Sequence, residues 1–264
     1  FYSMKDIQKL KDKRGLRLDR VGITKISLPL LIPHKKDTQQ VTASVNFFAD
    51  LRHSLKGHHM SRFVEILFRN RENILTFEKL KSIASEAKKE LQADNAYLEI
   101  SFIYFLKKEA PVSRKSSFVD YECKIYSRVN SGDSEQRIIV KVPVMLLCPC
   151  SKAISKFNAH NQRSIITVDA LLKGDLLIDE LIKTIEKNGS CEIYPVLKRP
   201  DEKYVTEKSY ENPKFVEDAV RDTALSIKKN KNILSFTVEC ESFESIHNHN
   251  AYARYTSIDD VKHN

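Results

Sequence analysis

The predicted order of strands and helices occurs twice along the chain, and this repeat constrains the fold more than any other feature. Alternating and apolar segments in the first half predict two strands, two helices and two strands, at residues 21–33, 41–51, 61 onward, 76–91, 97–106 and 118–129. The second half repeats this order at residues 137–147, 163–171, 176–187, 212 onward, 233–241 and 251–256. We therefore expect an α+β fold of two ββααββ halves, residues 21–130 and 131–264, after an N-terminal extension at residues 1–20.

The spacing of apolar residues supports these elements. The second strand alternates, with one side formed by Val41, Ala43, Val45 and Phe47. The first helix is predicted to bury a face formed by Phe63, Val64, Leu67 and Phe68. The second helix, with Thr76 as its N-cap, carries a stripe of Phe77, Leu80, Ala84, Ala87 and Leu91. In the second half, Asn212-Pro213 is expected to open a helix that buries Val216, Val220, Thr223, Ala224 and Ile227.

Each predicted half leaves backbone groups without partners. Four antiparallel strands with helices on one face expose the other face of the sheet and both of its edges. Such units are stabilised when they close edge to edge into a larger barrel. We therefore expect a homo-oligomer with functional sites where chains meet.

Composition and cysteine content indicate the compartment. The chain has five scattered cysteines, an odd number that does not suit a secreted disulfide framework. Its apolar runs are all far shorter than the roughly 20 residues of a membrane span. The polar, basic segment Met4–Arg20 also lacks the apolar stretch of a signal peptide. We expect a cytoplasmic protein that does not associate with a membrane.

A formal net charge of +9 points to three kinds of explanation. A basic protein can bind nucleic acid, attract a phosphorylated small substrate, or simply carry a solvated lysine-rich surface. The chain lacks an aromatic-interleaved basic stretch like those of common RNA-binding folds. We therefore expect no nucleic-acid partner, and an RNA-binding module remains the alternative from a different functional class.

The densest group of reactive residues joins Cys148 and Cys150 to His160, twelve residues after Cys148. A thiolate and an imidazole at the end of a strand and on the return loop can converge on one metal ion, because zinc and similar metals accept sulfur and nitrogen ligands. Few ligands are apparent, which favours a catalytic site over a closed structural one. The alternative is that these thiols only fill the core.

Two histidines near the C-terminus form a second group. His247 and His249 alternate in an extended segment, so both can face one pocket, and Glu244 precedes them. Histidine titrates near neutral pH and suits proton transfer to and from a heterocycle. A hydrated pair of histidines in a turn is the alternative.

Two glutamates are candidates for binding roles. Glu202 lies in a charged segment, Arg199–Lys203, that we interpret as a loop, and a carboxylate there can complete a metal shell. Glu217 lies early in the helix that follows Asn212, at the border of its apolar stripe. A carboxylate in that position can accept paired N–H donors from a guanine edge. Either residue can instead be an ordinary surface glutamate.

The segment His59–Phe63 is a candidate anion site. Ser61 is predicted to cap a helix and Arg62 follows it. A helix N-terminus with a hydroxyl and a guanidinium suits phosphate. A capped helix without a ligand is equally compatible.

Together, the motifs resemble those of one enzyme family. The segments Cys148–Lys152 and Ala159–Ser164 resemble the signature of the type IB GTP cyclohydrolases. Further matches, in the order expected for that family, are His59–Phe63, Arg199–Glu202, Tyr210–Asp218 and Glu244–Tyr252. The resemblance implies a tunnelling fold, in which tandem ββααββ halves pair into barrels within a homotetramer.

The resemblance also implies a reaction and a metal site. The implied activity is hydrolytic opening of the guanine imidazole ring of GTP, giving 7,8-dihydroneopterin triphosphate and formate for folate and queuosine-type pathways. Cys148, His160 and Glu202 are implied ligands of a divalent metal, either manganese, iron or zinc. Glu217 is the implied anchor of the guanine ring.

The remaining carried-over roles concern protons and phosphates. His247 and His249 are implied proton-transfer groups, with Glu244 supporting them. The candidates for binding the triphosphate are Lys152, Arg163, Ser61, Arg62 and His59. The nearest rival of the same fold is a nitrile reductase that uses a covalent cysteine and NADPH, and the Cys148/His160 pair with two histidines favours hydrolysis at a metal instead.

Overall fold

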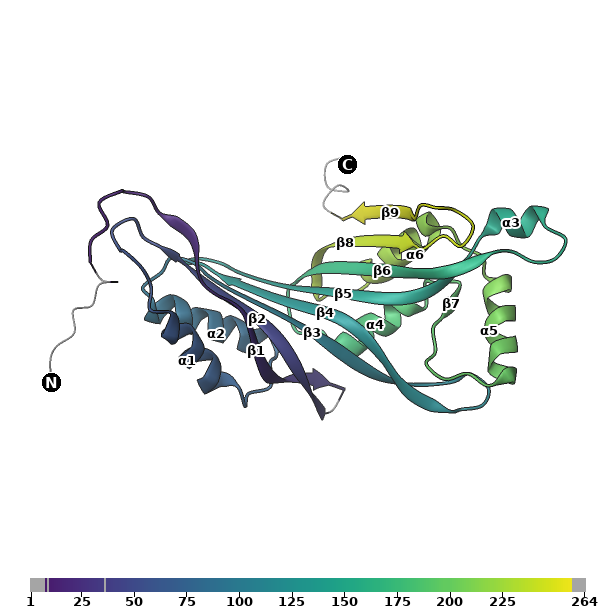
Figure 1. Ribbon diagram of the computed structural model, residues 1–264, viewed down its shortest axis with the longest axis horizontal. Helices are drawn as coiled ribbons and strands as arrows, with labels where there is room; N and C mark the ends of the chain where they lie inside the picture. Colours follow the sequence, from purple (N-terminus) through teal and green to yellow (C-terminus); the bar gives the residue numbers. More distant parts are fainter. Residues whose placement is uncertain (1–7, 9, 36, 258–264) are drawn as a thin grey trace. The chain divides into compact units, whose positions relative to one another are not determined.

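The computed structural model describes residues 8, 10–35 and 37–257. Within these residues the chain forms one sheet of nine strands together with six helices, which confirms the predicted α+β class (Figure 1). The strands are β1 (Leu18–His34), β2 (Asp37–Leu51), β3 (Ala96–Glu109), β4 (Ser116–Val129), β5 (Ser134–Leu147), β6 (Asn161–Leu172), β7 (Cys191–Glu192), β8 (Ile233–Ser242) and β9 (Ala251–Thr256). The helices are α1 (Met60–Asn70), α2 (Phe77–Glu90), α3 (Pro149–Ile154), α4 (Ile178–Glu186), α5 (Arg199–Glu211) and α6 (Val216–Lys228).

The strands follow one another across the sheet with few exceptions. The order is β1-β2-β3-β4-β5-β6-β8-β9, and the short β7 pairs with β5. The pairs β1–β2, β2–β3, β6–β8 and β8–β9 are antiparallel. None of the helices in the described part of the chain is long and apolar enough to cross a bilayer.

The chain divides into two compact units. Unit 1 comprises residues 1–102 and 124–137, and unit 2 comprises residues 103–123 and 138–264, each as far as its residues are described. The strands β3, β4 and β5 contribute to both units. The division into halves at residue 130 follows the order of elements and stays a prediction, as does the extension at residues 1–20, part of which lies outside the described residues.

Unit 1 buries the apolar side of β2 against two helices that lie side by side (Figure 1). The alternation predicted for β2 is confirmed, since Val45 and Phe47 have no exposed surface. The Phe47 ring meets Phe63 of α1 edge-on, with 5.3 Å between centroids. In α2 the predicted stripe is buried, and the Thr76 hydroxyl accepts a hydrogen bond from the Lys79 N–H at 3.1 Å as an N-cap.

The predicted face of α1 is partly wrong. Phe63 and Leu67 are buried, but Val64 is 41% and Phe68 58% exposed. The buried stripe continues through Ile66, because residues three and four apart share a helix face whereas Val64 is turned about 100° from Phe63. The N-cap is also His59 rather than Ser61, which lies inside the helix.

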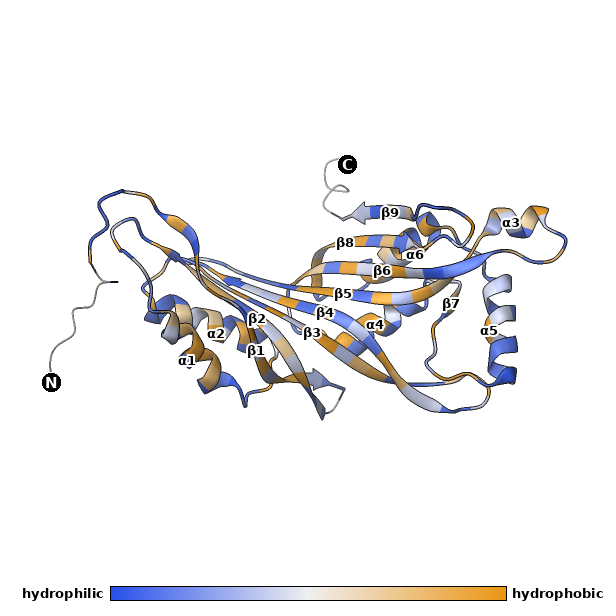
Figure 2. Cartoon of the chain, viewed as in Figure 1, coloured by the Kyte–Doolittle hydropathy of each residue, from blue (hydrophilic) through white to orange (hydrophobic). Residues whose placement is uncertain are grey.

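Unit 2 confirms the stripe predicted for α6. Apolar and polar residues alternate along its strands (Figure 2). A polar network links α4 to the strands. Lys108 of β3 donates to Glu186 of α4 at 2.6 Å, and Tyr121 of β4 donates to the same carboxylate at 2.6 Å. Burial, and then the Glu186 charge, raise the pKa of Tyr121 far above its usual range.

Two helices of unit 2 were not predicted. The segment interpreted as a charged loop is the first turn of α5, and α3 follows Cys148 directly. Asn212 ends α5 instead of capping the next helix, which begins at Val216 after the N-cap Phe215. Pro200 in the first turn of α5, followed by two acidic residues, is a helix-start signal that identifies α5 in retrospect.

Asp201 anchors the beginning of α5. Its buried carboxylate accepts hydrogen bonds from the backbone N–H groups of Val112, Ser113 and Lys198, each at 2.8 Å. Burial opposes ionisation, but these donors outweigh it and hold the pKa of Asp201 well below its usual range. The start of α5 is therefore fixed to the turn between β3 and β4.

Candidate active site

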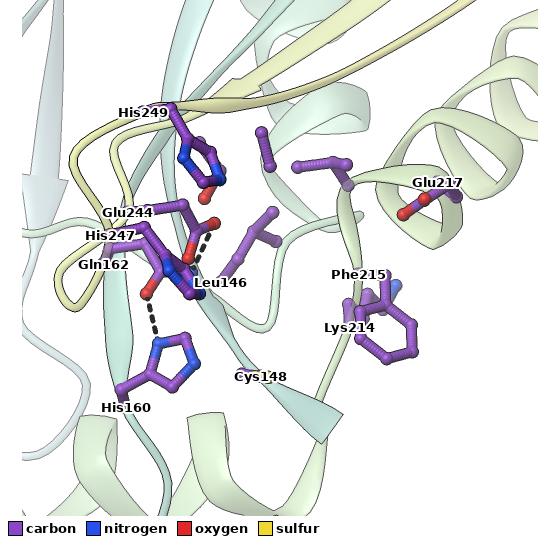
Figure 3. A pocket seen from close by; sticks show the side chains of 13 residues that line it. Leu146, Cys148, His160, Gln162, Lys214, Phe215, Glu217, Glu244, His247 and His249 are labelled. Atoms are coloured by element: carbon purple, nitrogen blue, oxygen red, sulfur yellow. Dashed lines mark hydrogen bonds between the residues drawn. The ribbon is translucent and has the colours of Figure 1, made fainter. Parts of the chain in front are cut away.

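A pocket of about 280 Å³ opens in unit 2, where segments distant in sequence meet (Figure 3). Its walls come from the ends of β5, β6 and β8, from the segment that leads into α6, and from the loop between β8 and β9. Small-molecule sites usually span roughly 300–1,000 Å³. The pocket therefore lies near the lower end of this range.

Cys148 lies where β5 ends and α3 begins. It is the N-cap of α3, Pro149 follows at the start of the helix, and its Sγ accepts a hydrogen bond from the Ser151 N–H at 3.4 Å. The Cys148 N–H donates to the carbonyl of His160 at 3.1 Å, and the His160 N–H donates to the Ser151 hydroxyl at 3.2 Å. These bonds hold the thiol and the imidazole on neighbouring backbone segments.

The other cysteines are poor candidates for chemistry at this pocket. Burial raises the pKa of the Cys123 and Cys240 thiols to about 12 and also raises that of Cys191, so all three stay protonated at neutral pH. Cys150 is exposed and does not line the pocket. Cys148 is therefore the cysteine that the structure favours.

His160 is joined to Glu244 through Gln162. The His160 Nδ1 lies 2.9 Å from Gln162 Oε1, and Gln162 Nε2 donates to Glu244 Oε1 at 3.3 Å (Figure 3). The sequence interpretation assigned no role to Gln162. His160 directly precedes β6 and Gln162 is the second residue of that strand, so the spacing of two residues is the signal that identifies Gln162.

His247 and His249 both line the pocket, as predicted from their alternation. Their rings stack with 5.0 Å between centroids and 16° between planes. Both side chains are exposed, so protons can exchange with solvent. The pair is suited to proton transfer at the mouth of the pocket.

Glu217 lines the opposite part of the pocket from the first turn of α6 (Figure 3). The segment before this helix is held against Cys148, because the Lys214 N–H donates to the Leu147 carbonyl at 3.0 Å. The Lys214 side chain also lines the pocket and donates to Asp222 at 2.7 Å. This backbone hydrogen bond brings the segment before Glu217 close to Cys148, although the two residues are far apart in sequence.

Three predicted residues of unit 2 do not line this pocket. Glu202 lies exposed in the first turn of α5. Lys152 donates to the Tyr210 carbonyl, and its ammonium lies 4.2 Å from the centre of the Tyr210 ring. Arg163 is exposed on β6. The proposed phosphate contacts therefore find no support in this pocket.

The remaining phosphate candidates belong to unit 1. His59 is the N-cap of α1, Ser61 is exposed, and Arg62 donates to the carbonyl of Glu90 at 2.9 Å. The Arg62 side chain thus caps the C-terminal end of α2. The pocket walls all belong to unit 2, so these residues contribute nothing to it within the described chain.

The residues present fit a metal ion incompletely. Cys148 and His160 supply sulfur and nitrogen donors of the kinds that zinc and related metals accept. In the part of the chain that the structure describes, no three His, Cys, Asp or Glu side chains are arranged to hold a metal. The third predicted ligand, Glu202, lies outside the pocket, in the first turn of α5.

The fold is shared with solved structures of low sequence identity. Uricase from Arthrobacter globiformis superimposes with a TM-score of 0.55 at 8% identity, over 93% of this chain and 95% of the uricase. A uricase from Bacillus fastidious gives 0.51 at 8% identity, over 95% and 96%. At such identity the likeness concerns the fold alone, and it supports the expected tunnelling fold.

Sequence comparison identifies the family. The family model described as type I GTP cyclohydrolase FolE2 matches residues 4–253. GTP cyclohydrolase FolE2 of Thermosipho africanus is 47% identical over 252 residues, which cover 95% of this chain and 96% of the relative. FolE2 of Methylobacillus flagellatus is 47% identical over 251 residues, covering 95% and 94%. With Cys148, His160 and Glu217 gathered at one pocket, these matches show that the chain belongs to the FolE2 family of type I GTP cyclohydrolases.

Proposed function

We propose that this protein is a metal-dependent GTP cyclohydrolase of type IB. It opens the imidazole ring of the guanine of GTP by hydrolysis and releases 7,8-dihydroneopterin triphosphate and formate. The observation that carries the proposal is that one pocket gathers Cys148, His160, Glu217 and the stacked histidines in a chain of this family. FolE2 relatives that match almost end to end carry the name of this activity.

Cys148 and His160 are the proposed metal ligands, with manganese, iron or zinc as the ion. Glu202 is the proposed third ligand, although in this chain it lies outside the pocket, in the first turn of α5. When bound, such a metal lowers the pKa of a coordinated water, which supplies hydroxide near neutral pH. His247 and His249 hold and release the protons that ring opening and formate release require, and Glu244 supports this region through Gln162.

Glu217 is the proposed anchor of the base. Its carboxylate accepts two N–H groups of the guanine edge, which orients the ring toward Cys148 and His160. The remote triphosphate supplies binding energy that holds the reacting carbon in place. The proposed contacts for it remain Lys152, Arg163, Ser61, Arg62 and His59.

Replacement of Glu217 by glutamine is expected to weaken nucleotide binding. Hydrogen bonds to a charged group contribute about 1.5–3 kcal/mol, so KM for GTP should rise by about 10- to 100-fold. Steady-state kinetics on Glu217→Gln measures this. The matched control is Glu180→Gln, which removes an exposed carboxylate from the first turn of α4, outside the pocket. Equal KM values for the wild type and Glu217→Gln would remove Glu217 from the site.

The reaction itself is tested with GTP and Mn²⁺, with and without EDTA. We expect formate and, after oxidation, pterin fluorescence to appear together, and both to disappear when EDTA removes the metal. Formation of neither product with manganese, iron or zinc would refute the proposed function. NADPH oxidation with a nitrile substrate would instead identify the reductase of the same fold.

We further propose that the chain acts as a cytoplasmic homotetramer in which the sheets close into barrels. Among the described strands, β1 and β9 end the sheet, and their outer backbone groups are the ones that a neighbouring chain would pair. GTP is the proposed substrate, and the product would serve folate and queuosine-type pathways. No nucleic-acid or membrane partner is proposed.

A further inference from the structure

The side-chain amide of Gln162 lies between His160 and Glu244 in the pocket and contacts both of them. Its Oε1 lies 2.9 Å from Nδ1 of His160 and 3.5 Å from the hydroxyl of Ser245. Its Nε2 donates to Glu244 at 3.3 Å. His160 directly precedes β6 and Glu244 follows β8, so the amide links two segments of the chain (Figure 3).

The contact with Glu244 determines which groups donate and which accept in the hydrogen bonds that join Glu244, Gln162 and His160. The Gln162 Nε2 faces Glu244 Oε1 at 3.3 Å and donates to it, so the NH₂ group is the end of the amide on that side. The Oε1 of the amide then faces His160 and only accepts. It follows that Nδ1 of His160 carries the proton, and that its Nε2 keeps a lone pair.

We propose that Gln162 is a positioning residue that sets the tautomer of His160 and leaves Nε2 ready to bind the metal. This inference rests on the proposed function, because metal binding is the role that the proposed function assigns to Nε2 of His160. Partners that accept the second N–H of a metal-binding histidine orient its ring in this way in other metal sites. Here the orienting partner is a neutral amide whose own direction depends on a carboxylate.

The strand does not depend on Gln162 for its own position. The pairing of β6 with β8 begins at Ser164 and Ser242, whose hydroxyls are 2.9 Å apart. The Phe243 N–H also donates to the Arg163 carbonyl at 3.0 Å. Replacement of the Gln162 amide should therefore change the histidine more than the fold.

The first test measures the tautomer of His160 directly in metal-free protein without nucleotide. Nitrogen-15 NMR of the histidine rings is recorded at about pH 8, where an ordinary imidazole is neutral, and His160→Gln assigns the signal. We expect the Nδ1–H form in the wild type and in Gln162→Glu, whose carboxylate still accepts from Nδ1. Gln162→Leu should shift His160 toward the Nε2–H form that free histidine prefers. Gln40→Leu, the same change at an exposed residue of β2, should leave the signal unchanged.

The second test measures Zn²⁺ affinity by competition with a chromogenic chelator. Loss of such a partner typically costs about 10- to 100-fold in metal affinity, which we expect for Gln162→Leu and not for Gln40→Leu. An Nε2–H form of His160 in the wild type would overturn the inference, even if the protein turns over GTP. So would an unchanged tautomer, or unchanged zinc affinity, in folded Gln162→Leu. Absence of formate from GTP would refute the proposed function alone, since the tautomer is measured without substrate or metal.

Discussion

Alanine in place of Cys148 is expected to reduce GTP turnover by more than about 100-fold while the protein stays folded. Removing an outer partner of a metal ligand already costs about 10- to 100-fold, and Cys148 is a proposed direct ligand. Its side chain is only partly buried and makes one weak hydrogen bond, from the Ser151 N–H at 3.4 Å. Formate release with saturating Mn²⁺ and GTP measures the effect, and thermal unfolding reports on the fold.

The neighbouring cysteine provides the matched control. Cys150→Ala makes the same chemical change two residues away, at an exposed thiol that does not line the pocket. We expect it to retain activity close to the wild type. Full activity of Cys148→Ala in metal-replete buffer would contradict the proposed ligand set, and equal losses in both variants would indicate a general effect on α3 instead.

Methionine in place of Lys108 is expected to lower the free energy of unfolding by about 3–5 kcal/mol, the usual effect of removing one partner of a buried ion pair. The side chains of Lys108 and Glu186 are 11% and 6% exposed, and their charged groups lie 2.6 Å apart. Without the ammonium, the Glu186 carboxylate keeps the Tyr121 hydroxyl as a donor but loses its counter-charge. Chemical denaturation monitored by circular dichroism measures the change.

An exposed pair with the same separation tests whether burial is the cause. Lys141 and Glu122 also lie 2.6 Å apart, but their side chains are 47% and 62% exposed. Lys141→Met should therefore cost at most about 1 kcal/mol. Adding Glu186→Gln to Lys108→Met should restore part of the loss, because the buried Glu186 charge is then removed, while Glu192, which lies 3.2 Å from Lys108 and is 24% exposed, still lacks its partner. Equal effects of the two lysine substitutions would contradict this explanation.

Features that depend on near neighbours in sequence were predictable. The alternation through Val45 and Phe47 reports directly which side of β2 is buried, since side chains in a strand alternate between faces. The convergence of Cys148 and His160 followed from a strand end and its return loop. Thr76 as an N-cap is equally local, because the cap bond spans three residues.

Features that depend on contacts across the fold were not predictable in the same way. The first turn of α5 looks like a charged loop until the backbone donors of Val112 and Ser113 are seen to bind Asp201, far away in sequence. The role of Gln162 depends likewise on Glu244, 82 residues later. A polar side chain can find its partner anywhere in the chain, so composition and spacing carry little information about such pairs.

The sequence by itself determined the α+β class, most strand positions and the candidate residues for the chemistry, because periodicity and short motifs are local properties of the chain. The tertiary structure alone decided which of those residues share a pocket. It placed Glu217 and the His247/His249 pair in the same pocket as Cys148 and His160, and it left Glu202 outside on α5. The physical reason is that the position of a side chain in space depends on how its helix or strand packs, and α5 is held by the buried Asp201 at a place that the spacing of residues does not specify.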